Sequence, residues 1–225
     1  MTSAVNRLVP TRAPQLSLAP QAYQQRDQDA RSNILRLYFN TIDSVFFNLL
    51  DGNGAGGKFL LFPYAAACRT TDQIFTANTA TRVTLDTNEF MNGCTNTGAN
   101  GIHVEQPGVY NYQFSAQLVN TDTQIHTAWI WLRVNGVDVL RTGSKFDVPS
   151  RHGGTDGYLI GTCNFYVELQ ANDYVELWAA VNQAYVPATS NGIYLEAYAA
   201  QTVPFPAPAI PSLVATLSFV SNLPS

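Results

Sequence analysis

Alternating apolar and polar residues dominate the middle of the chain, in residues 101–140. In residues 109–118 every second side chain is apolar, the pattern of a strand with one buried face and one exposed face. Residues 128–134 alternate in the same way and lead into Asn135-Gly136, after which residues 137–140 resume the pattern. A two-residue type I′ turn needs positive φ at both central positions, so Asn-Gly between such runs is a strong hairpin signal. We therefore predict two strands and a hairpin here.

Further short strands are predicted on both sides of this hairpin, with polar turns between them. The predicted strands are residues 58–63, 73–75, 81–86, 158–169, 174–181, 192–198 and 213–220. The predicted loops are residues 88–100, 141–156 and 187–191, and residues 202–211 are a proline-rich crossing that cannot pair centrally in a sheet. Strands at this spacing with only one helix predict a mainly β sandwich or barrel.

The N-terminal part of the chain is organised differently. Residues 1–20 are rich in proline and have no apolar period, which predicts an extended arm. Residues 21–50 have the pattern of one long α-helix. In residues 51–57, five of the seven positions are Gly or Asn, which predicts a joint between the helix and a knob formed by residues 58–225.

An apolar stripe runs along the predicted helix. Its members recur at alternating spacings of three and four: Leu35, Tyr38, Ile42, Val45 and Leu49, widened by Ile34, Phe46 and Leu50. Such a stripe needs a cover, and two interpretations remain open. The helix lies on the domain's own sheet, or it self-associates or docks into a larger assembly. Two heptads are too few to predict an independent coiled coil.

Composition and charge exclude several classes of protein. Only 12% of residues are charged and the net charge is −4, so nucleic acid is not an expected partner, because binding phosphates requires clustered Lys and Arg. The N-terminus lacks the apolar core of a signal peptide, and no run approaches the roughly 18 apolar residues of a membrane span. We expect synthesis in a cytosol and no membrane insertion. Cys68, Cys94 and Cys163 are odd in number and scattered, which is typical of structural thiols.

No group of residues has the pattern of a catalytic site. His103, His126 and His152 are isolated, and no Gly-x-Ser-x-Gly nucleophile motif is present. Glu168 and Glu176 flank a turn between adjacent predicted strands and are the nearest approach to a glycosidase acid pair, although their alternation with apolar residues favours two solvated carboxylates.

Metal and phosphate sites are not expected either. Asp122 and Asp156 are candidates for a shared calcium ion, but they lack the spacing of a known calcium loop. The glycine-rich residues 52–57 lack the Gly-Lys-Ser/Thr ending of a phosphate-binding loop. We therefore expect a protein that is not an enzyme and that has no cofactor and no metal.

The order of motifs in the knob resembles the jelly-roll family that includes the complement globular head and tumour necrosis factor. The resemblance rests on four stretches: Pro107-Gly-Val-Tyr110, the strand 130–136 that ends in Asn-Gly, the strand-turn-strand 165–177, and the closing pair 193–198 and 213–220. Two departures are Asn172, where the family commonly has Gly, and the proline-rich insert before the last strand. The resemblance implies an antiparallel jelly-roll sandwich and a homotrimer packed around an axis lined by aromatic residues.

The N-terminal block is similar to a different group of proteins. Residues 14–20 and 33–43, together with residues 113–118 and 131–136, resemble small structural proteins of tailed bacteriophages, in which a proline-rich arm and a helix precede a jelly-roll knob. This resemblance implies a virion protein that is made in the host cytoplasm and contacts other virion proteins of the tail or capsid.

Aromatic residues and loops are the candidate functional positions. The aromatic candidates for the sandwich core or the trimer axis are Tyr110, Tyr112, Phe114, Trp129, Trp131 and Trp178. A sugar-stacking surface is the alternative role for the tryptophans. The candidate recognition surface is formed by residues 88–100, 141–156 and 181–191, and its named residues are Asn96, Arg151, His152, Asp156 and Tyr185. A host-surface glycan is a candidate ligand for them.

These patterns lead to three hypotheses. The first is a non-enzymatic phage structural protein, in which Leu35, Tyr38, Ile42, Val45, Phe46 and Leu49 anchor a trimeric knob to the particle as a tail-associated fibre or host-adhesion protein. The length of the leader favours this hypothesis over the second, a capsid decoration protein at three-fold positions. The third is a carbohydrate-active enzyme on the same sandwich, which the missing acid pair disfavours.

Overall fold

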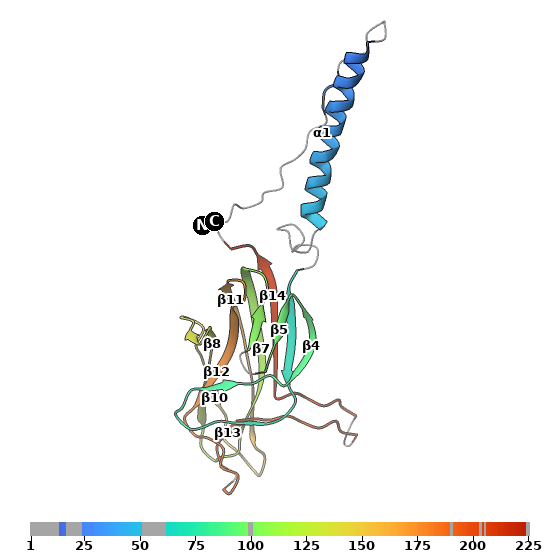
Figure 1. The fold of residues 1–225 in the computed structure, drawn as a ribbon. Coiled ribbons are helices and arrows are strands. Elements are labelled where there is room, and N and C mark those ends of the chain that lie inside the picture. The colour runs from blue at the N-terminus through green and yellow to red at the C-terminus, as the bar shows by residue number, and fades with distance from the viewer. Residues whose placement is uncertain are drawn as a thin grey trace. The chain divides into compact units, whose positions relative to one another are not determined.

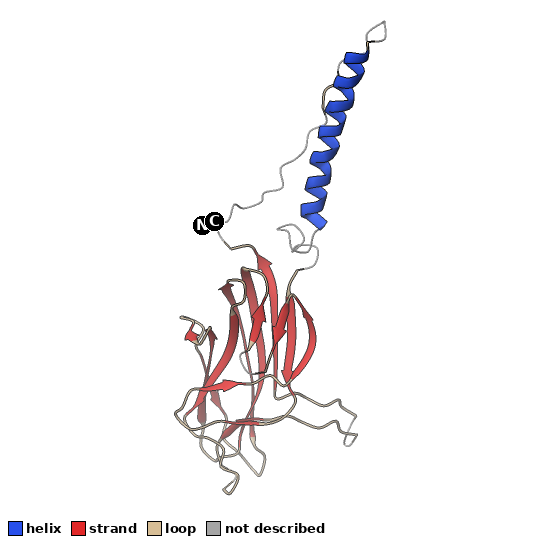
Figure 2. Ribbon diagram, viewed as in Figure 1, coloured by secondary structure: helices blue, strands red, loops and turns tan. Residues whose placement is uncertain are grey.

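The protein is mainly β, with two antiparallel sheets and, among the described residues, one helix (Figures 1 and 2). The computed structural model describes residues 14–16, 24–50, 62–98, 101–189, 191–202, 204 and 206–223, without the side chains of residues 47–50. The chain divides into two compact units, one that contains the helix and one that begins at Pro63 and contains the strands. Most of the predicted arm and the whole predicted joint lie outside the described residues. The predicted fold class, a jelly-roll-like β sandwich with an N-terminal helix, is confirmed.

Helix α1 spans Gln25–Leu50. Asp27 lies in its first turn, where a carboxylate interacts favourably with the positive end of the helix dipole. Two hydroxyl groups bond back to the carbonyl four residues earlier: Thr41 Oγ1 donates to Leu37 O at 2.8 Å and Ser44 Oγ to Asn40 O at 2.9 Å. No helix in the described part of the chain combines the length and apolarity that a membrane span needs.

The first sheet is built around β7 and is called the β7 sheet. Its order is β2 (Gln73–Ile74), β13 (Ile193–Leu195), β7 (Gly108–Asn120), β14 (Leu213–Ser221), β1 (Tyr64–Arg69) and β4 (Thr87–Asn92), and β11 (Gly157–Leu169) pairs with the other side of β7. Residues 109–116 of β7 pair with β14, and its last three residues pair with β13.

The second sheet is built around β8 and is called the β8 sheet. Its order is β10 (Ser144–Val148), β8 (His126–Val134), β12 (Tyr174–Val181), β6 (Ile102–Val104) and β5 (Cys94–Asn96). Two short strands extend it: β3 (Thr81–Val83) pairs with β12, and β9 (Val137–Asp138) pairs with β8.

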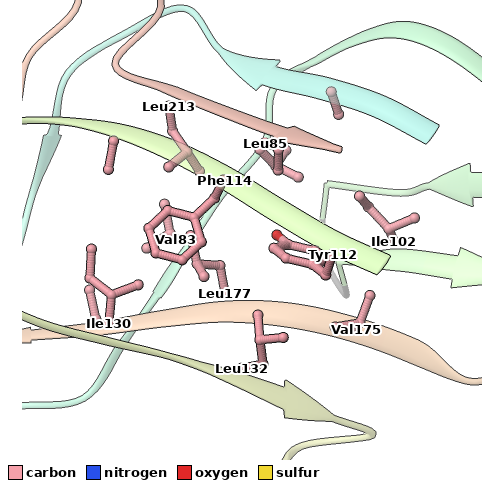
Figure 3. Packing of buried hydrophobic residues seen from close by; sticks show 14 of the residues in the cluster. Val83, Leu85, Ile102, Tyr112, Phe114, Ile130, Leu132, Val175, Leu177 and Leu213 are labelled. Atoms are coloured by element: carbon pink, nitrogen blue, oxygen red, sulfur yellow. The ribbon is translucent and has the colours of Figure 1, made fainter. Parts of the chain in front are cut away.

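The core lies between the two sheets. Tyr112 and Phe114 of β7 point toward Leu132 of β8 and Leu177 of β12, as Figure 3 shows, and all four side chains are buried. Burial alternates along β7, as the sequence predicts, because successive side chains of a strand point to opposite faces. Removal of this apolar surface from water is the main stabilising contribution expected for a domain of this size.

The predicted hairpin is confirmed in detail. Val134 pairs with Val137, so the loop between β8 and β9 contains only Asn135 and Gly136. Both residues have positive φ, 52° and 77°, as a type I′ turn requires. Asn172, which replaces the glycine common in the resembling family, also has positive φ, at 70°, a conformation that Asn tolerates better than most residues.

Three predicted segments differ from the structure. The predicted loop 88–100 contains most of β4 and all of β5, and the predicted loop 141–156 contains β10. Strand β10 was not predicted because its alternation spans only five residues in a polar context. Strand β4 was not predicted because it pairs, among the described strands, only with β1 and has no buried side chain. The first strand begins at Tyr64, later than the predicted residues 58–63, of which 58–61 lie outside the described residues.

One buried polar side chain holds several loop ends together. Asn120, the last residue of β7, is fully buried, and its Nδ2 donates to Gln124 O at 2.8 Å, Pro149 O at 3.0 Å and Val148 O at 3.3 Å. Its Oδ1 accepts a hydrogen bond from Asp122 N at 3.0 Å. A buried amide is stable only when such partners are present, so Asn120 ties the loop after β7 to the end of β10.

We predict that Leu132→Ala lowers the free energy of unfolding by about 2–5 kcal/mol, because it leaves a cavity between the sheets. Leu140→Ala is the matched control: Leu140 is 85% exposed, so its loss should cost less than about 0.5 kcal/mol. Denaturant unfolding of both variants measures the difference. Equal effects would contradict the placement of the core.

Candidate assembly and recognition surfaces

The outward face of the β7 sheet is uncharged across β11, β7 and β14 except at the end of β11, where Glu168 is exposed. The strand register places Thr162 beside Ser115, and Ser115 beside Val214. Cross-strand neighbours form further rows on either side of this one. On one side Ile160 lies beside Gln117. On the other side the rows are Asn164, Gln113 and Thr216, and then Tyr166, Asn111 and Ser218. None of these side chains carries a formal charge, which is unusual for a surface of this width. We call it the β7 face.

The β7 face contains a ridge and a groove. Tyr158, Ile160 and Tyr166 project from β11 and are 52%, 59% and 65% exposed. Beside them lies an open groove of about 590 Å³ whose floor crosses β11, β7 and β14. Its lining includes the small side chains Ser115, Thr162, Val214 and Thr216. Projecting apolar side chains beside a groove lined by small side chains are typical of a surface that packs against another protein.

Strand β11 is also an edge strand. Among the described strands it pairs only with β7, along all of its 13 residues. A long edge with exposed apolar side chains offers unpaired backbone groups to other chains, and natural proteins usually cover or interrupt such an edge. Both the side chains and the backbone of β11 therefore make this strand a candidate surface for association.

The outward face of the β8 sheet carries tryptophans and charged residues instead. Trp131 lies opposite Trp178 on the neighbouring strand. The guanidinium of Arg133 lies 3.8 Å from the centre of the Trp178 ring, a favourable cation–π contact. Glu176 is buried and pairs with Arg82 at 3.3 Å, and it also accepts a hydrogen bond from Trp178 Nε1 at 3.2 Å. Arg133 thus covers part of Trp178.

Hydrogen bonds also hold two carboxylates on the outward face of the β8 sheet, which we call the β8 face. Asp138 accepts bonds from Arg133 Nε and from Trp131 Nε1, the latter at 2.6 Å, and these bonds lower the pKa of the Asp138 carboxyl. A bond from Thr127 and a second from Lys145 lower the pKa of Asp147 in the same way. Most polar groups of this face are therefore already engaged with each other.

The six predicted aromatic residues separate into two groups. Tyr110, Tyr112 and Phe114 lie in the core between the sheets. The three tryptophans lie outside that core, on the β8 face, where Trp129 is 50% exposed and Trp131 and Trp178 are partly buried. The alternation of β8 explains this placement, because Ile130 and Leu132 occupy its inward positions.

The predicted recognition residues do not form one surface. Arg151 N donates to Asp122 O at 2.7 Å, and Thr121 N donates to Gly192 O at 3.1 Å, so the loops after β7, β10 and β12 meet at one end of the sandwich. Arg151 and Asp156 form an ion pair at 3.4 Å in this region, and His152 is exposed there. Asn96 lies elsewhere, because β5 and β6 pair beside the start of β12.

Tyr185 belongs to a small cluster of aromatic residues. Its ring centre lies 4.6 Å from that of Tyr194, whose hydroxyl donates to Glu196 Oε1 at 2.7 Å. Burial and the neighbouring Glu196 raise the pKa of Tyr194, so the hydroxyl remains a donor at any physiological pH.

Asn96, the predicted recognition residue on β5, is held in place by hydrogen bonds. Its Nδ2 donates to Asn88 Oδ1 at 2.8 Å, and its Oδ1 accepts a hydrogen bond from Gly98 N.

The structure corrects the expectation about two carboxylates. Glu168 on β11 belongs to the β7 sheet and Glu176 on β12 to the β8 sheet, so the turn between them crosses from one sheet to the other. They therefore do not lie side by side on paired strands. Glu168 is exposed, but Glu176 is 5% exposed and ion-paired, so it is not a solvated carboxylate.

The candidate calcium residues have protein partners. Asp122 Oδ2 lies 2.8 Å from His126 Nε2, and this hydrogen bond lowers the pKa of Asp122. Asp156 pairs with Arg151. Both candidate carboxylates are therefore already paired within the fold. The ring of His103 lies beside that of Tyr174, with ring centres 5.1 Å apart and planes tilted by 39°.

Comparisons with known proteins give little beyond the fold. No protein-family model matches the chain, and no curated protein matches its sequence. Among solved structures, the globular domain of the zebrafish complement 1qA protein is similar, with 10% sequence identity and a TM-score of 0.40, over 72% of this chain and 99% of that chain. A similarity at this level assigns no family to the chain.

The predicted anchoring residues lie on α1. Leu35 is 37% exposed and Phe46 53%, whereas Tyr38, Ile42 and Val45 are partly buried. The side chain of Leu49 lies outside the described residues. Leu37 and Phe39, which the sequence interpretation omitted, are 56% and 58% exposed, so apolar residues extend beyond the predicted stripe.

The ridge on β11 was not among the predicted site residues. The sequence does contain a signal for it: Tyr158, Ile160 and Tyr166 occupy the positions of residues 158–169 that alternate with the inward Val167 and Leu169. A strand with large apolar side chains on both faces is expected to be covered on both faces. Comparison of the two alternating sets of residues in this strand would have identified the ridge.

The buried cysteines give a prediction about pH and reactivity. Burial, with a smaller contribution from the nearby Glu105 charge, raises the pKa of Cys94 to about 12, and burial also raises the pKa of Cys68. Because the thiolate is the reactive form, iodoacetamide at pH 8 should leave both unmodified in the native protein and modify all three cysteines in denaturant. Peptide mass spectrometry measures the labelling. Rapid labelling of native Cys94 would contradict its buried position.

Proposed function

We propose that the protein is a non-enzymatic structural protein that self-associates through the β7 face as a homotrimer. The observation that carries this proposal is the uncharged β7 face with the ridge on the edge strand β11. Aromatic residues are enriched and charged residues depleted in the cores of protein interfaces. Tyr158 and Tyr166 match the first feature, and the uncharged rows of β11, β7 and β14 match the second.

The relief of the face suits an interface between identical copies. The ridge of one copy fits the groove of small side chains on the next, and each copy contributes both parts. The lack of charge also favours such pairing, because a charged side chain in the interface would lose its hydration on association. The number of copies, three, follows from the sequence resemblance to the jelly-roll family of complement and tumour necrosis factor.

The helix supports attachment of this trimer to a larger particle. Leu35, Leu37, Phe39 and Phe46 of α1 are exposed in the single chain and need a partner. The resemblance of the N-terminal block to structural proteins of tailed bacteriophages makes a virion the particle that we propose. The knob then acts as a tail-associated fibre or host-adhesion protein.

The end of the sandwich near Asn120 is the part that we propose to contact the host. Three loops meet there, and the hydrogen bonds of the Asn120 amide hold two of their ends. Loops on a rigid scaffold are frequent recognition surfaces because they change without disturbing the core. Arg151, His152 and Tyr185 are the proposed contacts, and a host-surface glycan is the proposed ligand class.

We predict that Ile160→Asp dissociates the trimer. A charge buried without a partner costs several kcal/mol, so the association constant should fall by about a hundredfold or more. The matched control is Leu140→Asp, which places the same charge at an exposed site outside the β7 face. Sedimentation velocity should show a monomer for the first variant and a trimer for the second. A trimer in both variants would place the interface elsewhere.

We also predict that a chain beginning at Gly57 stays trimeric and soluble but is no longer incorporated into particles. The reason is that it keeps the β7 face and loses the helix. Quantitative mass spectrometry of purified virions measures incorporation and, for the full chain, copy number. One or two dozen copies per particle support the tail assignment, and hundreds would favour the capsid decoration alternative. Normal incorporation of the shortened chain would refute the anchoring role.

A further inference from the structure

The apolar residues of α1 fall into a heptad register. If Leu35 is assigned to position a, Tyr38 occupies d, Ile42 the next a and Val45 the next d. The preceding d position is Arg31, so the apolar seam begins at Leu35. We propose that this seam pairs with α1 of two further copies as a parallel three-stranded coiled coil. The proposal rests on the trimer proposed above: it assigns the apolar seam to the same helix in the other copies and leaves the exposed Leu37, at position c, for contact with the particle.

The flanks of the seam support a parallel arrangement of identical helices. In a parallel coiled coil, position g of one helix lies beside position e of the following heptad in its neighbour. Here Ile34 and Thr41 occupy g, and Phe39 and Phe46 occupy e. Ile34 therefore lies beside Phe39 of the partner subunit, and Thr41 beside Phe46 of the partner subunit. The arrangement covers Ile34, Phe39 and Phe46, which are 37%, 58% and 53% exposed in the single chain.

The charges of the helix are compatible with this pairing. Between Ser32 and Phe46 the only charged residues are Arg36 and Asp43, and both occupy position b, on the outside of a coiled coil. Positions e and g carry no charge that would repel its copy in a neighbouring helix. Arg36 Nη2 instead donates to Asn33 Oδ1 at 2.8 Å within its own helix.

Two of the four seam residues favour three strands over two. Parallel dimers favour β-branched residues at a with Leu at d, whereas β-branched residues at both positions shift the preference toward trimers and larger bundles. Ile42 at a and Val45 at d are both β-branched. The heptads with described side chains are too few for a stable isolated coiled coil, but attachment to an associated knob raises the local helix concentration to about the millimolar range.

The test uses the full-length chain with a single added cysteine. Ile42→Cys places a thiol at position a, where it faces its copies, and Asn40→Cys places one at the exposed position f as the matched control. Both variants keep the native cysteines, so the background is equal. After mild oxidation of a dilute sample, a non-reducing gel should show several-fold more disulfide-linked dimer for Ile42→Cys than for Asn40→Cys.

Sedimentation velocity of the same samples separates the two proposals. A trimer with selective cross-linking of Ile42→Cys supports the coiled coil. A trimer in which the variants cross-link equally, or not at all, overturns the coiled coil and leaves the knob trimer intact. A monomer overturns both proposals, and a dimer overturns the three-stranded arrangement. A circular dichroism measurement on Ile42→Asp/Val45→Asp should show loss of helix signal, and an unchanged signal would also contradict the pairing.

Discussion

Burial of the inward faces of the two sheets against each other is the constraint on which the rest of the knob depends. Along β7, Tyr110, Tyr112 and Phe114 fill the space between the sheets, so the residues between them must point outward. The same holds for β8, where Ile130 and Leu132 face the core and Trp129 and Trp131 face away from it. The strands that form the core thereby also determine the chemistry of both outer faces.

The two outer faces differ in how many of their side chains have hydrogen-bond, ion-pair or cation–π partners within the same chain. On the β8 face, Arg133 covers Trp178, and the buried Glu176 is matched by Arg82. A buried carboxylate requires such partners, so this face is largely complete in the single chain. In the described part of the chain the β7 face has no comparable network, and its ridge lies on an edge strand with 13 residues. This face is therefore the one that we propose for assembly.

Much of the fold was predictable because its signals are local. The Asn135-Gly136 turn, the long strands β7, β8, β11 and β12, and helix α1 all follow from periodicity and turn chemistry. Strands β4, β5, β6 and β10 were missed, because short or edge strands bury too few side chains to impose a clear pattern. The candidate site was predicted less well. The recognition role of the loops around Arg151 and Tyr185 stays a prediction, and the ridge on β11 was not predicted.

The sequence by itself determined which residues of the long strands alternate, where the Asn135-Gly136 turn lies and which apolar helix positions recur at spacings of three and four, since each of these depends on neighbours along the chain. Only the tertiary structure decided which sheet each strand joins. Strands β11 and β12 are consecutive, yet they belong to opposite sheets, which separates Glu168 from Glu176. Tertiary structure also decided which face of each strand is outward, and hence that the tryptophans lie outside the core. Strand pairing joins residues distant in sequence, and no local pattern encodes that choice.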